Sequence, residues 1–456
     1  MAQKNKTDMI NGNPTTSLIA FTLPVILGNL FQQLYNIVDS VVVGRCVGEE
    51  ALAAVGTSSS ITFLFIAIAT GLSIGSGVVI SQLFGAQEYK RMKTSIYTSI
   101  VSIVAISSVL MIVGVLMHMQ ILRIMNTPAQ VMDDAAVYLK IYFYGLVFLF
   151  LYNVTNAVFN ALGRSKIPLV FLTFSSVLNI VLDLVFVIRY HMGVAGVAWA
   201  TLISQALSAL GSLIVLLRLV SKFRTEERAS VFHYEDLRRI GTVALPSMIQ
   251  QSIVSVGIVC VQSLVNSFGS VVMAGYAAAS KIDNIAINPM VNIGNAVSTF
   301  TAQNIGAGKV ERVKQGYRAG ILMNAVICTI LLGIVVIFGR SVIGMFMDGG
   351  TANGSIEIGV EYIRVVSIFY FLMGFMNVTN GVLRGAGDIG YFMFATLCNF
   401  VSRVALAYIM ANFIGMRAVW WSIPLGWMIG LVVSRARYRS GKWKSKSLVD
   451  GCYKDD

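Results

Sequence analysis

Residues 95–118, SIYTSIVSIVAISSVLMIVGVLMH, contain no Asp, Glu, Lys or Arg. A helix needs about 20 mostly apolar residues to cross the hydrocarbon core of a bilayer, so this stretch predicts a membrane span. Lipid cannot satisfy open backbone groups, which leaves the α-helix as its structure. The whole chain agrees, because 56% of its 456 residues are hydrophobic and only 12% are charged, whereas soluble domains carry about 25% charged residues.

Eleven further runs of this kind lie on either side of that stretch. The sequence therefore predicts an all-α polytopic membrane protein with twelve transmembrane helices. The spans are expected near residues 17–43, 52–82, 95–118, 136–160, 168–188, 194–217, 242–266, 273–302, 317–338, 358–382, 390–412 and 418–434.

The positive charges give the orientation. With the N-terminus placed inside, 25 of the 34 Lys and Arg residues fall in inside segments and five in outside loops, while four lie within or at the edge of spans. Cytoplasmic segments carry such an excess, so both termini are expected in the cytoplasm and the chain in the plasma (inner) membrane. The net charge of +13 is explained by this topology, and no nucleic-acid partner is expected.

Three pairs of similar stretches form an internal repeat. The paired stretches are 22–24 with 244–246, 81–93 with 302–314, and 153–163 with 377–387. Their offsets are 222, 221 and 224 residues. Each half contains six spans, so both halves enter the membrane from the same side. Parallel repeats of this kind occur in transporters that rock two lobes around a central site.

The repeat gives a domain organisation. We expect a cytoplasmic N-terminal tail at 1–16, an N-terminal lobe of six spans at 17–218 and a cytoplasmic linker at 219–240. A C-terminal lobe of six spans follows at 241–435, and a cytoplasmic tail at 436–456.

Acidic residues inside the predicted spans are few and are candidates for function, because a charge at that depth costs at least about 2.5 kcal/mol. Asp39 shares one helix face with Gln32 and Asn36. Asp183 shares one with Asn179. Both acids are expected about 8–12 Å below the outer surface, from the rise of roughly 1.5 Å per residue.

Thr201, in the sixth span, is expected at the same depth and lies in a polar face of its own. The acids and this hydroxyl can therefore meet in one plane within the N-terminal lobe. Two carboxylates in an apolar surrounding repel each other, so such a pair is suited to hold a proton or a small cation. Asn179 and Thr201 would add neutral oxygens to either state.

The C-terminal lobe lacks this pair. At the repeat offsets, Asp39 corresponds to Val261, Asp183 to Ala407 and Asn179 to Arg403. The third acid within a span, Asp283, follows Lys281 by two residues, so the two side chains do not face each other, and a structural role for Asp283 is about as well supported as a cavity role. Residues considered as cavity lining are Gln251, Lys281, Asn288, Asn292 and Arg403, with helix–helix hydrogen bonding as the alternative.

At this point the chain resembles the multidrug and toxic compound extrusion (MATE) family, closest to its bacterial DinF-like and MepA-like branch. The residues that carry the resemblance are Pro24, Asn36-Ile37-Val38-Asp39 followed by Gly44, Ala51-Leu52-Ala53-Ala54-Val55-Gly56, Gly85-Ala86, Gly306-Ala307, and Asn179-x-x-x-Asp183 with Thr201. The resemblance covers about residues 15–435.

The resemblance implies two pseudo-symmetric lobes in a V around a central cavity. It implies multidrug efflux by alternating access, with H⁺ or Na⁺ exchanged for an organic, often cationic and amphipathic compound. It carries over Asp39, Asn179, Asp183 and Thr201 as cation-coupling residues, and Pro24 as a bending point. No cofactor is expected, and no metal beyond Na⁺ at these four coupling residues. The expected partners are small-molecule drugs and membrane lipid, and the expected state is a monomer.

Two other classes of function are alternatives. A flippase for lipid-linked oligosaccharides would need a cationic cavity, for which only Lys281 and Arg403 are candidates. A membrane enzyme is disfavoured, because the three histidines (His118, His191 and His233) form no cluster and the five cysteines have no metal-like spacing. The protein is therefore expected not to be an enzyme.

Overall fold

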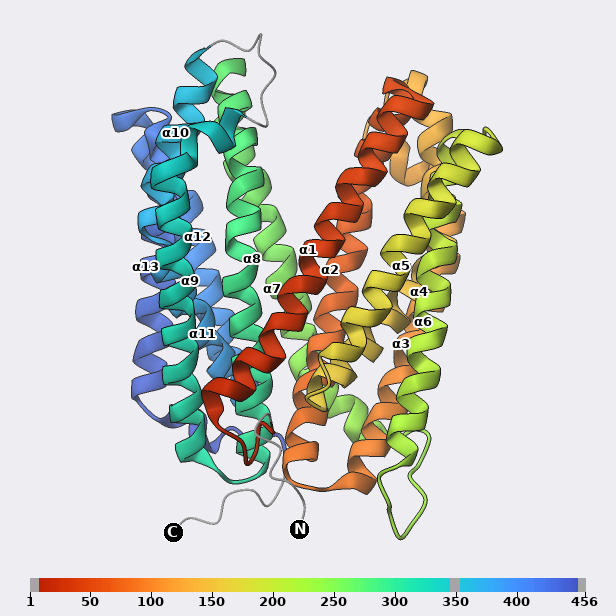
Figure 1. The fold of residues 1–456 in the computed structure, drawn as a ribbon, viewed down its shortest axis with the longest axis vertical. Coiled ribbons are helices and arrows are strands. Elements are labelled where there is room, and N and C mark those ends of the chain that lie inside the picture. Colours follow the sequence, from red (N-terminus) through yellow and green to blue (C-terminus); the bar gives the residue numbers. More distant parts are fainter. Residues whose placement is uncertain (1–7, 345–352, 450–456) are drawn as a thin grey trace. The chain divides into compact units, whose positions relative to one another are not determined.

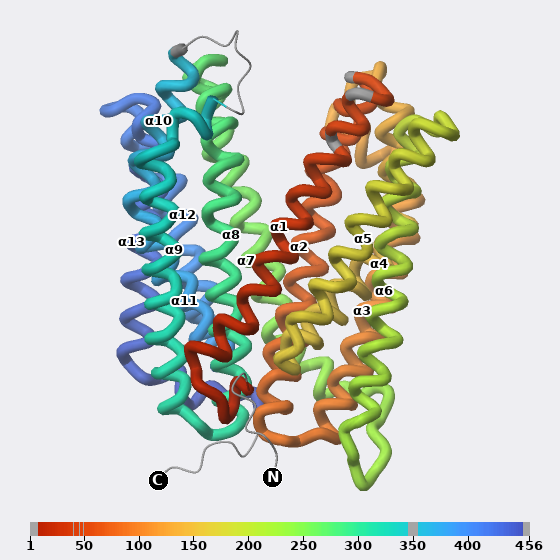
Figure 2. Tube along the Cα trace, viewed as in Figure 1, coloured from red at the N-terminus to blue at the C-terminus, as the bar shows by residue number. Residues whose placement is uncertain are grey.

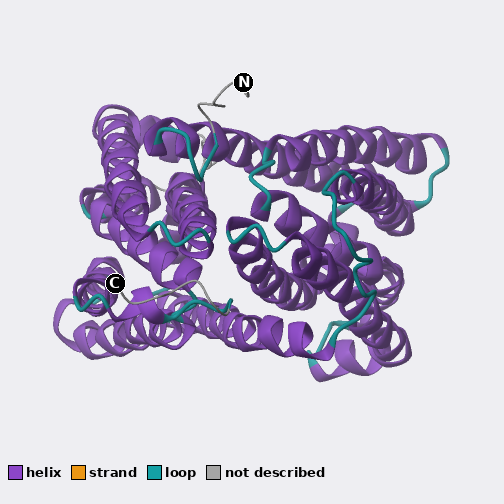
Figure 3. Cartoon of the chain, turned by 90° about the horizontal axis from the view of Figure 1, so that it is seen from below, coloured by secondary structure: helices purple, strands orange, loops and turns teal. Residues whose placement is uncertain are grey.

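The computed structural model describes residues 8–344 and 353–449, and every regular element within them is a helix (Figure 3). The absence of strands from these residues confirms the predicted all-α class. The first seven residues of the predicted N-terminal tail and the last seven of the predicted C-terminal tail lie outside the described part (grey in Figure 2).

The N-terminal half supplies six long helices and two short π-helices (Figure 1). They are α1 (Pro14–Val42), η1 (Val43–Val47), α2 (Glu49–Gly85), α3 (Tyr89–Ile124), α4 (Ala129–Ala161), α5 (Lys166–Asp183), η2 (Leu184–Arg189) and α6 (Gly193–Ser221).

The C-terminal half supplies seven α-helices and one short 3₁₀ turn. They are α7 (Tyr234–Asn266), α8 (Ser270–Gly306), α9 (Val310–Gly344), α10 (Asn353–Ile368), α11 (Tyr370–Ala386), α12 (Ile389–Ile414), α13 (Arg417–Arg439) and η3 (Lys442–Ser445).

The helices account for the twelve predicted spans. Ten of those described are long and apolar enough to cross a membrane, or eleven if α10 and α11, which are bent by 49° at Phe369, form one span. The remaining predicted span is α8, which has 37 residues but contains Lys281, Asp283 and several asparagines that lower its hydropathy. Together with the outward-facing apolar side chains, such as Leu116 (70% exposed) and Ile337 (72% exposed), this identifies a multi-pass membrane protein.

The chain forms two compact units, each of which is described by itself. Unit 2 comprises Leu23–Met248, and unit 1 comprises Met1–Thr22 together with Ile249–Asp456. The chain therefore changes unit inside α1, just before Pro24, and inside α7, just after Pro246. The predicted lobes divide at the 219–240 linker, so the compact units differ from them by the first turns of these two helices.

Glycines in the repeated stretch at 377–387 allow α11 to pack closely on α8 in unit 1. A Cβ added to Gly381 would lie 2.3 Å from the carbonyl oxygen of Gly294, and one added to Gly385 would lie 2.2 Å from that of Ser298. Side chains cannot approach backbone that closely, so only glycine permits this contact.

Candidate functional site

Asp39 and Asp183 lie at the ends of two helices of unit 2. Asp39 is three residues from the end of α1, and Asp183 is the last residue of α5. Each helix then continues as a π-helix, η1 after α1 and η2 after α5. Such π-helical turns are rare and frequently occur at functional sites. The two π-helices contact each other, and Val43, Val187 and Val197 bury their side chains in the small apolar core that they share.

The structure brings the carboxyl groups of Asp39 and Asp183 within hydrogen-bonding range of each other. Asp183 is fully buried and Asp39 is partly buried. A hydrogen bond between two carboxyl groups requires a proton on one of them, because two carboxylates are both acceptors. The pair can therefore hold a proton between its members or share a cation.

Neutral oxygens lie on the same face of α5 as Asp183. Ser176, Asn179 and Asp183 are buried along one face of α5, as their spacing predicts. The amide nitrogen of Asn179 donates to the hydroxyl oxygen of Thr201 on α6, at 3.3 Å, which leaves the amide oxygen of Asn179 available. The four predicted coupling residues thus belong to one cluster within unit 2.

The cluster contains buried oxygens that no donor in the described part of the chain reaches. These oxygens are Asp39 Oδ1, Asp183 Oδ1 and Oδ2, Asn179 Oδ1 and Ser176 Oγ. A buried polar atom without a partner is costly, and clusters of them mark places where water, a proton or an ion binds. Since all of these atoms are oxygens, the site has the donor chemistry for H⁺ or a hard cation.

Tyrosines next to the cluster were not predicted from the sequence. Tyr35 and Tyr138 lie within electrostatic range of both carboxyl groups. Tyr138, Tyr142, Thr201 and other residues of α4 and α6 line a small cavity of about 10 Å³, which is room for about one water molecule. Tyr35 could have been found four residues before Asp39 on the same helix face, whereas no local pattern points to Tyr138 on α4.

The other predicted residues of α1 are Gln32, Asn36 and Pro24. Gln32 and Asn36 are exposed on the helix, although they share a face with Asp39. Pro24 lies within α1, which continues as a helix through it. The bending role predicted for Pro24 is a property of motion, and it stays a prediction.

Unit 1 has a different chemistry at the equivalent positions. Val261 and Ala407, which correspond to Asp39 and Asp183, are fully buried in the main apolar core of unit 1. Asp283 is buried elsewhere in this unit and accepts two hydrogen bonds, from the hydroxyl of Tyr370 at 2.7 Å and from that of Tyr362 at 3.1 Å. Its carboxylate therefore fixes α8 to α10 and α11, a structural role that the sequence left open.

Arg403 lies within electrostatic range of Asp283, and its buried Nε has no hydrogen-bond acceptor in the described residues. The other predicted cavity residues of unit 1 differ in exposure. Lys281 is exposed, Gln251 and Asn288 are half-buried, and Asn292 is buried. Asn288 donates to the backbone oxygen of Asn284 at 2.9 Å, a bond within α8 that is neither cavity lining nor the helix–helix bond given as its alternative.

Comparisons with known proteins agree with the fold and the repeat. The MatE family model matches residues 24–185 and again residues 246–409. The starts of the two matches are separated by the 222-residue offset that pairs residues 22–24 with 244–246. The model thus matches each half of the chain separately, which confirms the resemblance seen in the sequence.

Relatives of similar length extend this match. The probable multidrug resistance protein YpnP of Bacillus subtilis (strain 168) is 29% identical over 442 residues, 97% of this chain and 98% of that protein. The multidrug export protein MepA of Staphylococcus aureus (strain NCTC 8325) is 21% identical over 407 residues, 89% of each chain.

Solved structures share the fold. A MATE protein crystallised in complex with MaL6 has a TM-score of 0.90 at 24% identity, over 97% of this chain and 100% of that chain. A MOP superfamily transporter from Pyrococcus furiosus has a TM-score of 0.88 at 24% identity, over 98% of this chain and 100% of that one. Because the family model covers well over half of the sequence, in two copies placed as the repeat requires, this chain belongs to the MatE family.

Proposed function

We propose that the protein is a secondary active multidrug efflux transporter. It exports organic, often cationic and amphipathic compounds in exchange for H⁺ or Na⁺, by alternating access. The observation that carries this proposal is the buried pair of Asp39 and Asp183 with its unpartnered oxygens. The names of the relatives, a multidrug resistance protein and a multidrug export protein, support the same class of substrate.

The coupling step follows from the chemistry of the pair. Two carboxyl groups without protein donors are most stable when a proton or cation compensates their charge. Binding of that ion changes the charge at the point where α1 becomes η1 and α5 becomes η2. Release of the ion leaves two charges that repel each other, which favours separation of the two helix ends. Movement of one charge across 100 mV supplies about 2.3 kcal/mol to such a step.

The flippase alternative is less well supported. Arg403, one of its two candidate cations, lies near the carboxylate of Asp283, so part of its charge is already compensated within unit 1. A pyrophosphate group would have to compete with that carboxylate. Drug efflux requires no such anion site.

The test uses purified protein in proteoliposomes with an imposed H⁺ or Na⁺ gradient and a fluorescent lipophilic cation as substrate. Asp39→Asn and Asp183→Asn are expected to abolish gradient-driven uptake. Asp133→Asn is the matched control, because Asp133 is an exposed acid near the start of α4. Replacement of Na⁺ by K⁺ at fixed pH then distinguishes Na⁺ coupling from H⁺ coupling, since uptake is lost only if Na⁺ is the coupling ion. Wild-type uptake in both of the first two variants would refute the coupling role.

A further inference from the structure

The segment that leads into α1 is held firmly within unit 1. The guanidinium of Arg312, at the start of α9, donates to the backbone oxygens of Met9 at 3.1 Å and Gly12 at 2.8 Å. The amide of Asn304 donates to the same Met9 oxygen at 3.1 Å, and Arg312 Nε in turn donates to the side-chain oxygen of Asn304 at 3.0 Å. Lys309 adds bonds to this segment, including one of 2.8 Å to Asn11 Oδ1.

Burial of side chains shows that this segment is part of the fold. Met9 is 4% exposed, and Leu18 and Phe21 in the first turns of α1 are also buried. The change of unit follows Thr22, which is 2% exposed. The first turns of α1 therefore pack in unit 1, whereas the rest of the helix belongs to unit 2.

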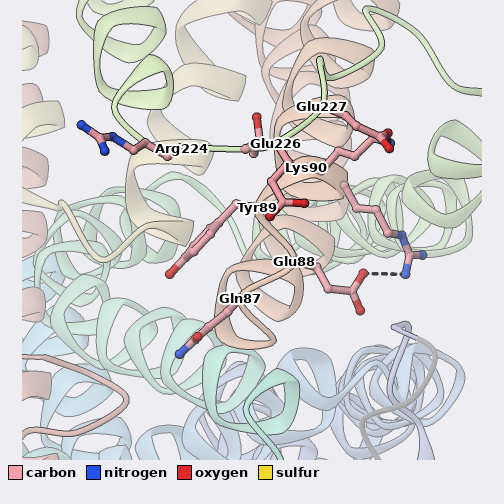
Figure 4. Close-up of a pocket in the computed structure, with 9 residues that line it drawn as sticks. Gln87, Glu88, Tyr89, Lys90, Arg224, Glu226 and Glu227 are labelled. Atoms are coloured by element: carbon pink, nitrogen blue, oxygen red, sulfur yellow. Dashed lines mark hydrogen bonds and ion pairs between the residues drawn. The ribbon is translucent and has the colours of Figure 1, made fainter.

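The segment that leads into α7 has the corresponding arrangement in unit 2. The ring of Phe223 stacks on Tyr89, with centroids 5.2 Å apart, and Thr225 accepts a hydrogen bond from Lys93 at 3.4 Å. The loop with Arg224 and Glu226 lies beside Tyr89 and Lys90 across a groove of about 450 Å³ (Figure 4).

An arginine again faces the start of the helix. Arg91 bonds Glu88 at 2.7 Å and lies within electrostatic range of Asp236, which is 4% exposed in the first turn of α7. The next turns pack closely on α2, since a Cβ added to Gly75 would lie 2.8 Å from the carbonyl oxygen of Ile240. The first turns of α7 therefore pack in unit 2, whereas the rest of the helix belongs to unit 1.

The two arginines occupy equivalent positions of the internal repeat. Arg91 lies in the stretch 81–93 and Arg312 in 302–314, at the offset of 221 residues that relates these stretches. Each arginine has an aspartate within electrostatic range near the start of the first helix of a half. Asp8, before α1, lies within this range of Arg312, and Asp236, in α7, lies within it of Arg91. Arg312 thus bonds the segment before α1, and Arg91, at the equivalent position of the repeat, interacts electrostatically with the first turn of α7. Each of these two helices then continues into the other unit.

We infer that Arg312 and Arg91 are a matched pair of anchors, which keep the first turns of α1 and α7 attached to unit 1 and unit 2 throughout the transport cycle. This inference rests on the proposed transport function. With one end of each helix fixed, any change between the two units is taken up where the helices change unit, next to Pro24 and Pro246. These prolines suit that place because proline removes a backbone hydrogen bond. The arginines are positioning residues that act through the helices.

The first experiment compares Arg312→Gln with Arg318→Gln. Arg318 is an exposed arginine on the same helix, and it makes no hydrogen bond or ion pair with the described residues of the leading segment, so it controls for loss of charge. Hydrogen exchange of the peptide 8–16 is expected to be faster in Arg312→Gln alone. The transport rate per folded molecule is expected to fall by roughly tenfold, the scale of losing hydrogen bonds from a charged donor. Arg312→Lys should partly restore the slow hydrogen exchange and the transport rate, because it keeps the positive charge. Recovery should be incomplete, because the lysine ammonium cannot reproduce the planar, forked donors of the guanidinium.

Arg91→Gln is expected to have the same effect on exchange of the peptide 233–241. Unchanged exchange in the leading segments of both variants would overturn the inference, whether or not the protein transports the tested cation. Faster exchange with an unchanged transport rate would also overturn it, because the anchors would then have no part in the cycle. If the wild type transports nothing while exchange responds as expected, the proposed function fails and the anchor contacts stand.

A cross-link distinguishes a segment that stays attached to unit 1 throughout the cycle from one that must detach during it. In a background without the five native cysteines, Asn11→Cys and Lys309→Cys are joined by a short bis-methanethiosulfonate cross-linker, at a place where the native side chains bond at 2.8 Å. Cross-linked protein is expected to transport at the rate of protein without the cross-link. Loss of transport on cross-linking, restored by reductant, would refute an anchor that holds throughout the cycle.

Discussion

Substitution of two buried aspartates by asparagine should separate stability from transport. Asp183 on α5 and Asp283 on α8 are both buried within the membrane-spanning part of the chain. They differ in their partners. Neither oxygen of Asp183 receives a hydrogen bond from the described residues, whereas each oxygen of Asp283 accepts one from a tyrosine. Asp183→Asn is therefore expected to affect transport, and Asp283→Asn to affect folding.

The magnitudes follow from the bonds that each substitution removes. A hydrogen bond to a charged group contributes about 1.5–3 kcal/mol. Asn at position 283 keeps one acceptor oxygen, so about one such bond is lost, and Arg403 loses its compensating charge. We expect a loss of about 2–4 kcal/mol in the free energy of unfolding, which overlaps the range of about 3–5 kcal/mol for breaking a buried charged pair. Asp183→Asn removes one of two neighbouring acids, and its amide can donate to Asp39 in place of the proton that the two carboxyl groups share, so the free energy of unfolding should change by less than about 1 kcal/mol.

The assay measures thermal unfolding and gradient-driven uptake on the same purified variants in lipid nanodiscs and proteoliposomes. Asp183→Asn should unfold at the wild-type temperature and transport nothing. Asp283→Asn should unfold at a lower temperature and keep transport in the fraction that remains folded. If Asp183→Asn proves as unstable as Asp283→Asn, the unpartnered oxygens are structural and the reasoning about the acid pair is wrong.

Three further outcomes can be checked. Pro24→Ala should leave the melting temperature unchanged or higher and lower the uptake rate several-fold, because a helix without proline bends less readily. Gly385→Ala should cost about 3 kcal/mol or more, since its Cβ would meet a carbonyl oxygen, whereas Gly333→Ala meets nothing and should be neutral or stabilising by up to about 1 kcal/mol, as denaturation curves would show. Asp388→Asn breaks a buried ion pair of 2.6 Å with Arg437 and should lower the free energy of unfolding by about 3–5 kcal/mol without changing uptake per folded molecule.

The sequence could predict the spans because lipid imposes a simple pattern on them. It could not predict where the helices end. The apolar run 95–118 lies inside α3, whose 36 residues extend for about 54 Å, well beyond a hydrocarbon core of about 30 Å. The helix continues into water because its backbone hydrogen bonds do not depend on lipid. The same reasoning explains why polar α8 exceeds its predicted bounds.

The proximity of Asp39 and Asp183 could be predicted from the spacing of residues along each helix and from their depth in the membrane, because both can be read from the sequence of each span alone. The tyrosine neighbours could not, because Tyr138 reaches the pair only through the packing of α4. The π-helices after Asp39 and Asp183 lie in valine-rich runs whose pattern fits an α-helix equally well. The segment 8–13 reads as a solvated tail, and only the tertiary contacts of Arg312 show that it is held. The arrangement of the lobes in a V stays a prediction.

Some residues recur at equivalent positions in both halves of the repeat, and others occur in one half only. The arginines at positions 91 and 312 and the prolines at 24 and 246 recur. The prolines lie in the two helices that change unit, and the arginines lie in α3 and α9 and interact with the starts of those helices. The acids do not recur, because Val261 and Ala407 occupy their places in an apolar core. A movement shared by two units needs matching attachments on both, whereas an ion that drives the movement needs a binding site on only one. On the proposed function, a single acid pair in unit 2 is therefore expected to be enough to drive transport.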